Sequence, residues 1–236
     1  MELKIKSLHK SYGKQKVISG LNMDFSSEGI HCLFGPSGCG KTTLVNILAG
    51  VIPYDSGDIQ GFNNKSFSYI FQEERLLPWA TVEKNIKFVL ESYNHKGDID
   101  SIVDNYLSLV DLEEFKNYYP KELSGGMKQR VSIARALAYD GDILIMDEPF
   151  KGLHLNMKKT LMDYIIDYWH RKKGLFILIT HDADEALCMA NYIHVLEGPP
   201  LTLKKEIVID EPPGKARSGI DKIQKYREML EDKITE

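Results

Sequence analysis

The chain has 236 residues, of which 43% are hydrophobic and 27% are charged, and this ordinary globular composition excludes a disordered or fibrous protein. Thirty lysines and arginines against 34 acidic residues leave a net charge of −4, so the composition predicts no nucleic-acid partner. Three cysteines are too few, and odd in number, for a disulfide framework, so we expect a reducing compartment. No apolar run approaches the roughly 18–20 residues that span a bilayer, and the first ten residues lack the apolar segment of a signal peptide. If the protein works at a membrane, another chain must supply the membrane part.

The first 25 residues predict an antiparallel hairpin, because apolar and polar residues alternate on both sides of a turn near Gly13. Five later apolar runs are nearly continuous instead of alternating. Such runs are typical of strands buried on both faces, as in a parallel sheet covered by helices. The five runs are Ile30–Phe34, Phe67–Phe71, Ile143–Met146, Leu175–Ile179 and Ile193–Leu196. We therefore predict an α/β fold with a mostly parallel sheet.

A helical segment is predicted at about residues 81–140, which contain no comparable apolar run. Thr81 is a candidate N-cap for a helix over Val82–Ser92, and a helical period resumes at Ile99. The segment separates the second apolar run from the third. We therefore expect a helical subdomain that is inserted between two strands of the sheet.

The hydrophobic pattern weakens after about residue 200. Leu201–Ile209 is consistent with an edge strand, and Gly219–Lys233 with an amphipathic helix. We see no internal repeat or low-complexity tract. We expect a single domain over residues 1–236, in which residues 201–236 form a C-terminal extension.

A phosphate-binding loop of the form G-x-x-x-x-G-K-[ST] is present from Gly35 to Thr42. It follows one of the apolar runs and leads into a predicted helix, which is the context that the motif requires. Its glycines let consecutive backbone N–H groups turn toward a phosphate, and the helix N-terminus adds positive potential. Lys41 is predicted to reach the β- and γ-phosphates, and the Thr42 hydroxyl to bind Mg²⁺. A glycine-rich turn without a ligand is the alternative, and the flanking strand and helix favour nucleotide binding.

The residues of this loop that we expect to hold the nucleotide are Gly35, Pro36, Ser37, Gly38, Cys39, Gly40, Lys41, Thr42 and Thr43.

Two acids, Asp147 and Glu148, end the apolar run that begins at Ile143. A buried carboxylate is costly unless it meets a cation, so Asp147 is a candidate for the Mg²⁺ side of the site. Glu148 is a candidate for the base that orients and deprotonates an attacking water, a role worth about 10²–10⁴ in rate. The alternative is a strand that leaves the core at an acidic turn, which is disfavoured in a chain that carries a phosphate-binding loop.

A second anion-binding helix start is predicted in Leu123–Arg130. Ser124 is a candidate cap for a helix that begins near Gly126, and the adjacent Gly125 and Gly126 free backbone N–H groups to approach an anion. One triphosphate does not obviously need two such helix starts. A plain N-cap is the simpler interpretation.

Taken together, the phosphate-binding loop, Leu123–Arg130, Ile143–Glu148 and His181 resemble the ATP-binding subunit of an ABC transporter. Leu123–Gln129 is a close match to the signature sequence of that family, which most other P-loop ATPases lack. The resemblance covers about residues 1–200. It implies a P-loop NTPase core with an antiparallel N-terminal β subdomain and an inserted helical subdomain, and it implies ATP and Mg²⁺ as cofactors.

The resemblance assigns roles to three further residues. Tyr12 aligns with the aromatic residue that stacks on adenine, Gln72 with the glutamine that touches Mg²⁺ or the water, and His181 with the histidine that contacts the γ-phosphate. It also implies that two copies pack head to tail, so that the Ser124–Gly126 turn of one copy closes over ATP on the other. Each side chain also has a simpler interpretation, as a hairpin cover, a polar strand end and a helix cap.

The strand pattern supports a shared site independently of the resemblance. Gly35, Gln72, Asp147 and His181 each follow the carboxyl end of an apolar run. In a parallel sheet those ends lie along one edge, where ligands bind. We therefore expect these four residues to be neighbours around one phosphate.

One position departs from the family pattern. After Glu148 and Pro149 the family usually continues to a Leu-Asp pair at the dimer seam, whereas here Leu153 is followed by His154. The aspartate usually braces the facing phosphate loop, so coupling between the two ATP sites is put in question. A neutral histidine still accepts a hydrogen bond and gains charge at mildly acid pH. We expect ATPase activity that is retained but altered.

The segment after Gln72 favours the importer branch of the family. In importers this segment forms part of the groove for the permease, where Leu76, Leu77 and Trp79 would present apolar surface. Packing inside the helical subdomain is the other interpretation. The run Arg75–Trp79 resembles the branch for nitrate, sulfonates, taurine and related solutes, which includes thiamine-precursor pyrimidines. The choice of solute rests on this analogy alone.

The resemblance implies a set of partners: a second ATPase subunit (a homodimer or a paired chain), an integral-membrane permease, and an extracytoplasmic solute-binding protein that acts through the permease. The expected place is the cytoplasmic face of the membrane. A soluble ABC-type ATPase that acts on DNA or ribosomes is an alternative, although the chain lacks the basic or coiled-coil insertions of that group. A non-catalytic regulatory subunit is another, which Glu148 and His181 disfavour and His154 keeps open.

Overall fold

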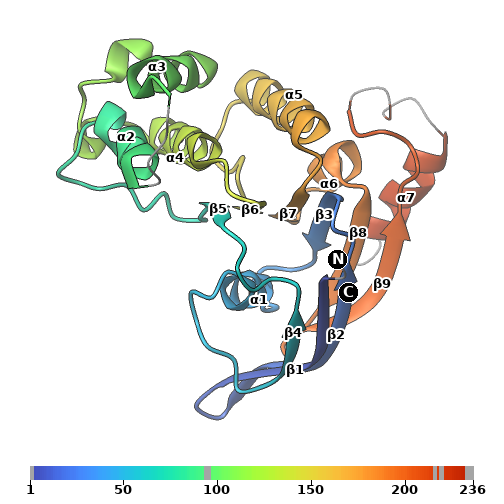
Figure 1. The fold of residues 1–236 in the computed structure, drawn as a ribbon. Coiled ribbons are helices and arrows are strands. Elements are labelled where there is room, and N and C mark those ends of the chain that lie inside the picture. The colour runs from blue at the N-terminus through green and yellow to red at the C-terminus, as the bar shows by residue number, and fades with distance from the viewer. Residues whose placement is uncertain (1–2, 93–96, 215–216, 218–220, 232–236) are drawn as a thin grey trace. The chain divides into compact units, whose positions relative to one another are not determined.

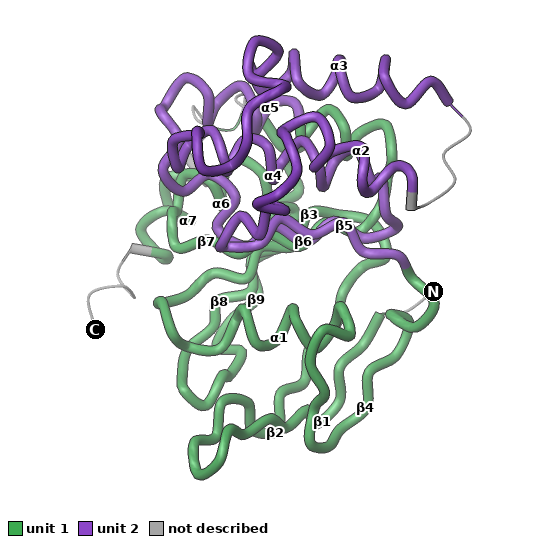
Figure 2. Tube along the Cα trace, turned by 90° about the vertical axis from the view of Figure 1, so that its left-hand side faces the viewer, with its two compact units in different colours: residues 1–65, 165–236 green, residues 66–164 purple. Residues whose placement is uncertain are grey.

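The computed structural model describes residues 3–92, 97–214, 217 and 221–231. The chain divides into two compact units, of which unit 1 comprises residues 1–65 and 165–236 and unit 2 comprises residues 66–164 (Figure 2). Each unit has its own strands, helices and buried core, so each is described by itself. The single domain with a helical subdomain at about residues 81–140 therefore stays a prediction.

Unit 1 contains a three-stranded antiparallel sheet in the order β2-β1-β4 (Figure 1). Strands β1 (Leu3–Tyr12) and β2 (Gln15–Phe25) form the predicted hairpin, in which Tyr12 is opposite Gln15. Strand β4 (Ser56–Gln60) was not predicted. Its residues are almost all exposed and do not alternate, because it only borders β1 and faces no core.

A second sheet of unit 1 has the order β7-β3-β8-β9. Strand β3 is parallel to both β7 and β8, and β9 is antiparallel to β8. Every residue of β3 and β7 is buried, which confirms the interpretation of continuous apolar runs as parallel strands. The strands are β3 (Gly29–Phe34), β7 (Leu175–Thr180), β8 (Tyr192–Glu197) and β9 (Thr202–Val208).

Three helices lie wholly in unit 1, and they are α1 (Lys41–Leu48), α6 (Ala183–Met189) and α7 (Asp221–Glu231). Helix α5 (Leu155–Lys172) begins in unit 2 and ends in unit 1. Helix α7 has Ile223 and Leu230 buried, as expected for the predicted amphipathic helix, and the ends of that prediction at residues 219–220 and 232–233 lie outside the described residues.

Unit 2 pairs β5 (Phe67–Ile70) with β6 (Ile143–Asp147) in parallel, with Phe67 opposite Ile143. Its helices occupy the segment predicted to be helical, and Lys84 N donates to the Thr81 hydroxyl at 3.3 Å, which confirms the predicted N-cap of α2. The helices and 3₁₀ turns between the two strands are α2 (Val82–Ser92), α3 (Ile99–Leu109), η1 (Glu113–Phe115), η2 (Pro120–Glu122) and α4 (Gly125–Tyr139). None of the helices within the described ranges is both long and apolar enough to cross a bilayer.

A pair of histidines is buried in the second sheet of unit 1. His31 on β3 is 1% exposed, and its Nδ1 lies 2.9 Å from Nε2 of His194 on β8, which is also fully buried. Tyr192 stacks on the His31 ring at 4.3 Å, and Glu206 Oε2 lies 3.3 Å from His194 Nδ1. Burial, helped by the neighbouring His194, lowers the pKa of His31 to about 2. His31 is therefore neutral in the folded protein at every ordinary pH.

The neutral state of His31 predicts a loss of stability in acid. The unfolded chain gains a proton at His31 below its ordinary pKa of about 6.5, whereas the folded chain does not, so folding is penalised by about 2 kcal/mol between pH 7 and pH 5. Urea unfolding of the wild type and of His31→Phe at both pH values measures this difference. We expect the variant to lose that part of the pH dependence, and substitution of the exposed His170 to leave it intact. If the free energy of unfolding changed equally between pH 7 and pH 5 in the wild type and in His31→Phe, the neutral state of His31 would be contradicted.

Candidate functional site

The phosphate-binding loop lies between β3 and α1, as predicted. Gly35 is the first residue after β3, and its backbone lies close to β8. A Cβ at this position would lie 2.3 Å from the carbonyl oxygen of Leu196, so only glycine fits here. Gly40, the N-cap of α1, has φ 114°, a conformation that disfavours other residues. The first turn of α1 carries no acidic side chain, so the N-terminal end of the helix keeps its positive potential.

The Lys41 ammonium is held inside this loop. The residue is 6% exposed, and its Nζ donates to the carbonyl oxygens of Gly35 at 2.7 Å and Pro36 at 2.8 Å. Cys39, whose side chain is buried, lies 3.7 Å from the same Nζ. A buried positive charge bound by neutral carbonyls still attracts an anion, so the loop has the chemistry for a phosphate.

Tyr12 is at the end of β1, and its side chain is 52% exposed. The Lys10 ammonium lies 5.2 Å from the centre of the Tyr12 ring and 3.5 Å from Oδ1 of Asp55. Asp55 also accepts a hydrogen bond from Ser11 N at 2.7 Å, which holds the strand end in place. The ring is thus half exposed at a strand end that the Asp55 contacts hold in place.

His181 follows β7 directly and is exposed. Because Phe34 of β3 is opposite Thr180 of β7 in the parallel register, the residues that follow them, Gly35 and His181, emerge at the same edge of the sheet. The cap of α6 is Asp182, whose side chain accepts from the backbone N–H groups of Asp184 and Glu185, so His181 is not the capping residue.

The two acids of unit 2 differ in environment. Asp147 is the last residue of β6 and is 2% exposed. Glu148 follows with φ 47°, a conformation that is uncommon for residues other than glycine and is often found at functional sites. Lys151 Nζ lies 3.6 Å from Glu148 Oε2. The chain thus turns directly after β6, and the second acid stands at the start of this turn.

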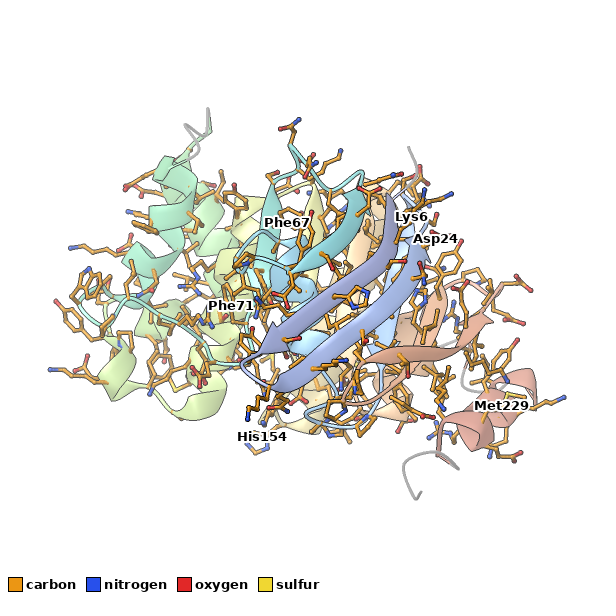
Figure 3. The ribbon with its side chains drawn as sticks, turned by 90° about the horizontal axis from the view of Figure 1, so that it is seen from below. Lys6, Asp24, Phe67, Phe71, His154 and Met229 are labelled. Carbon is orange, nitrogen blue, oxygen red and sulfur yellow. The ribbon has the colours of Figure 1, made fainter. Side chains whose placement is uncertain are left out.

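Gln72 is exposed and follows β5, whose last residue, Ile70, is opposite Met146 of β6. The ends of these two parallel strands therefore place Gln72 and Asp147 at the same edge of the unit 2 pair. Phe71, which is labelled in Figure 3, follows the last residue of β5, and the Arg75 guanidinium lies 4.2 Å from the centre of its ring.

The Ser124–Gly126 turn begins α4 as predicted. The Ser124 hydroxyl accepts from Met127 N at 3.3 Å, which confirms Ser124 as the N-cap and places the helix start at Gly125. A Cβ at Gly125 would meet no atom within 4 Å, so the backbone there is open to a large ligand. At Gly126 a Cβ would come within 3.3 Å of the Gly152 carbonyl oxygen, so this glycine lies against the segment that follows Glu148.

Helix α4 also carries two side chains that sequence reasoning missed. Arg135 donates from Nη1 to the Arg75 carbonyl at 2.9 Å and from Nη2 to the Glu74 carbonyl at 3.0 Å. Gln129 is buried and donates to the Pro149 carbonyl at 2.7 Å. The signature helix is therefore tied both to the segment after Gln72 and to the segment after Glu148. Bonds of this kind leave no spacing signal, because their acceptors are backbone carbonyls far away in the sequence.

A third missed residue, Asn85, fixes the segment that contains Trp79. Asn85 is fully buried, accepts from Leu77 N at 2.8 Å and donates to carbonyl oxygens that include those of Leu77 and Ala80. Trp79 is 74% exposed, whereas Leu76 and Leu77 are half-buried. The predicted apolar surface is thus carried mainly by one tryptophan, on a loop that Asn85 binds through hydrogen bonds.

His154 is exposed and lies at the start of α5 (Figure 3). Its carbonyl accepts from Lys158 N at 2.9 Å, the first bond of that helix. The residue therefore occupies the capping position of α5, where an aspartate side chain would stabilise the free backbone N–H groups better than a histidine does.

The structure accordingly gathers the predicted residues into two groups. Unit 1 holds the phosphate-binding loop, Tyr12 and His181, and unit 2 holds Gln72, Asp147, Glu148 and the Ser124–Gly126 turn. Within each unit, the residues that follow neighbouring parallel strands lie at the same edge of the sheet, as predicted. The meeting of both groups around one nucleotide stays a prediction.

Comparisons with known proteins agree with this arrangement. The protein-family profile described as ABC transporter matches residues 18–151. An aliphatic sulfonates import ATP-binding protein of Bacillus licheniformis is 38% identical over 93% of this chain and 89% of its own length. A nitrate import ATP-binding protein of Synechocystis is 36% identical over 90% of this chain and 84% of its own length.

A solved structure of similar fold is a dimeric ATP-binding cassette in a post-hydrolysis state with ADP and Pi. It superposes with a TM-score of 0.81 at 24% identity and covers 89% of this chain and 100% of its own. This likeness confirms the predicted fold class: a P-loop α/β core with an antiparallel N-terminal part and inserted helices. The profile and the relatives show more, since they match the signature region as well as the phosphate-binding loop. The chain belongs to the ABC transporter family and is one of its ATPases.

Proposed function

We propose that this chain is the ATP-hydrolysing subunit of an ABC importer and powers uptake of a small solute of the nitrate, sulfonate or taurine kind through a separate permease. The observation that carries the proposal is the buried Lys41 ammonium in a glycine-rich loop at the start of α1, combined with the signature turn at the start of α4. The relatives named as sulfonate and nitrate import proteins support the direction of transport and the class of solute.

The nucleotide would be held mainly by unit 1. Tyr12 would stack on the adenine, and residues 35–43 would surround the phosphates with backbone N–H groups and the Lys41 charge. Mg²⁺, with Thr42, Gln72 and Asp147 as its ligands, would neutralise charge on the phosphate oxygens. Hydroxyl, amide and carboxylate oxygens are ligands that this ion accepts, so these residues fit it.

Hydrolysis would depend on Glu148, His181 and Gln72. Glu148 would act as the base that takes a proton from the attacking water, and its uncommon positive φ is of the kind found at functional sites. His181 would contact the γ-phosphate and hold its position as the bond to the β-phosphate breaks. Phosphoryl transfer needs mostly positioning and charge stabilisation, so a correct distance matters more here than covalent chemistry.

Pairing of two ATPase subunits completes the proposed site. The open backbone at Gly125, with Ser124 and Gly126 on either side, would close over the ATP held by the other subunit. Two such sites in a head-to-tail dimer would link ATP binding to dimer closure. A dimer therefore forms the working unit in this proposal.

The permease would dock against the segment around Trp79. Its exposure on a loop that Asn85 and Arg135 hold in place supports a partner surface, because an exposed tryptophan on a rigid segment is typical of interfaces. The subunit would then lie at the cytoplasmic face of the membrane, and an extracytoplasmic binding protein would deliver the solute to the permease.

Lys41→Ala tests nucleotide binding. Loss of a charged donor that contacts two phosphates should weaken ATP binding by about 10- to 100-fold or more. Titration with a fluorescent ATP analogue measures the change, and exchange of the exposed Lys14 for alanine is the control. Unchanged affinity in a folded Lys41→Ala protein would contradict the proposed loop function.

Glu148→Gln tests the general base and the dimer together. The variant should bind ATP, lose about 10²-fold or more in turnover, and accumulate as a dimer. Gel filtration at saturating MgATP measures the dimer, and Glu114→Gln, at an exposed position of unit 2, is the control. A monomeric Glu148→Gln protein under these conditions would count heavily against the mechanism.

His154→Asp tests the departure from the family pattern. Aspartate caps α5 and should raise the free energy of unfolding by about 1 kcal/mol. If the aspartate also restores the brace between two sites, turnover and its ATP cooperativity should change as well. His154→Asn caps the helix without the charge and separates the two effects. If neither turnover nor cooperativity responds to His154→Asp, the position has no part in coupling.

A further inference from the structure

An arginine of the C-terminal extension is buried without being part of the nucleotide-binding residues. Arg217 is 2% exposed and is among the largest fully buried side chains. Its Nη1 donates to the carbonyl oxygens of Leu187 at 3.1 Å and Ala190 at 2.6 Å. Its Nε donates to the Glu211 carbonyl at 2.9 Å, and Nη2 donates to the same oxygen. A guanidinium is costly to bury, so these four hydrogen bonds indicate a specific position.

The acceptors belong to the end of α6. Leu187 is in the last turn of this helix and Ala190 is its C-cap, and the Cys188 carbonyl between them accepts from Gly214 N at 2.9 Å. A helix leaves its last carbonyls without partners inside the helix, and a positive charge there also interacts favourably with the helix dipole. Burial lowers the pKa of Arg217 to about 10, so the side chain keeps its charge at neutral pH. The extension thus supplies the C-terminal cap of α6.

The other end of α6 is joined to His181. Only Asp182, the N-cap, separates His181 from the helix. Asp182 N donates to the Thr180 hydroxyl at 3.0 Å, and that hydroxyl donates to Glu185 Oε2 at 2.5 Å. The helix, its cap and the end of β7 therefore form one hydrogen-bonded piece. A shift of α6 would move His181 with it.

Helix α7 adds a second contact with the same helix. Arg227 pairs with Asp184 in the first turn of α6. Helix α7 also contacts β9, where Lys205 Nζ is 3.5 Å from Met229 Sδ, and Figure 1 shows α7 beside β9. The extension therefore contacts α6 at its beginning and at its end.

We propose that Glu211–Gly214, Arg217 and α7 form a clamp that positions His181 through α6, and that Arg217 is the positioning residue of this clamp. The inference rests on the proposed contact between His181 and the γ-phosphate. The clamp itself touches neither nucleotide nor metal in this proposal. Its effect is on turnover, since His181 acts on the bond that breaks, whereas the phosphate-binding loop and Tyr12 determine the affinity for ATP.

Steady-state ATPase kinetics of Arg217→Ala and Arg217→Lys test the clamp. Arg217→Ala should lower kcat about 10-fold and leave KM for ATP within about twofold, because a small misplacement of a group that acts on the reacting bond costs rate. Arg217→Lys keeps a charged donor and should recover part of the loss. Guanidinium at about 10 mM should restore part of kcat in Arg217→Ala only, since it fits the space left by the side chain. Lys225→Ala, at an exposed position of α7, is the control and should behave as wild type.

Two further measurements separate the clamp from general stability. Hydrogen exchange of the amides of α6 should be about 10-fold faster in Arg217→Lys, while the amides of α1 are unchanged. In a His181→Ala background, Arg217→Ala should cause little additional loss of kcat, because both changes act through the same side chain.

The outcomes distinguish the two proposals. If His181→Ala alone leaves kcat unchanged, the role proposed for His181 is wrong. If His181→Ala lowers kcat and Arg217→Ala adds its full factor to that loss, the positioning inference is wrong. The inference would also be wrong if hydrogen exchange of the α6 amides were the same in Arg217→Lys and the wild type. It would be wrong as well if Arg217→Ala raised KM for ATP, left kcat unchanged and did not respond to guanidinium.

Discussion

The parallel pairing of β3 with β7 is the constraint on which unit 1 depends. Phe34 is opposite Thr180, and this register alone brings Gly35 and His181, 146 positions apart in the numbering, to one sheet edge. A slip by one residue would turn each side chain to the other face of the sheet. All residues of both strands are buried, so the register is strongly determined by the core. In unit 2, the parallel pairing of β5 with β6 likewise brings Gln72 and Asp147 to one edge of the pair.

Conformational strain and buried charge are concentrated beside these strand ends. Glu148 has a positive φ directly after β6, and Lys41 is buried directly after the loop that follows β3. Each is unfavourable when considered alone, and each is compensated locally. The Lys41 ammonium donates to two carbonyls, and Gln129 holds the segment after Glu148 through the Pro149 carbonyl. Sites of this kind are where proteins tolerate a local cost for the sake of function.

Much of the fold could be predicted from the sequence because its signals are local. Continuous apolar runs indicated β3 and β7, and the cap residues Thr81 and Ser124 indicated the starts of α2 and α4. Strand β4 escaped, since its exposed residues have no hydrophobic pattern and it forms only by pairing with β1. Local sequence patterns indicate which residues are buried and which cap helices, but they do not indicate an exposed strand at the edge of a sheet.

The residues of the candidate site also divide into those with a local sequence signal and those without one. Its motif residues were identified because nucleotide chemistry demands particular side chains at particular spacings. Asn85, Arg135 and Arg217 were not identified, because each binds backbone carbonyls, and carbonyls are present at every residue. Only the folded chain determines which carbonyls lie within reach. Residues that support a site are therefore harder to predict than residues that perform its chemistry.

The two contacts of the extension with α6 differ in the charge of their acceptors. Arg227 meets a carboxylate at a partly exposed position, so dissolved salt screens that attraction. Arg217 donates to backbone carbonyls at a position that is only 2% exposed, where dissolved salt screens an interaction much less. A rise in ionic strength should therefore weaken the contact at the beginning of α6 more than the contact at its end. Dissolved salt would then change the freedom of this short helix without changing its sequence or its fold.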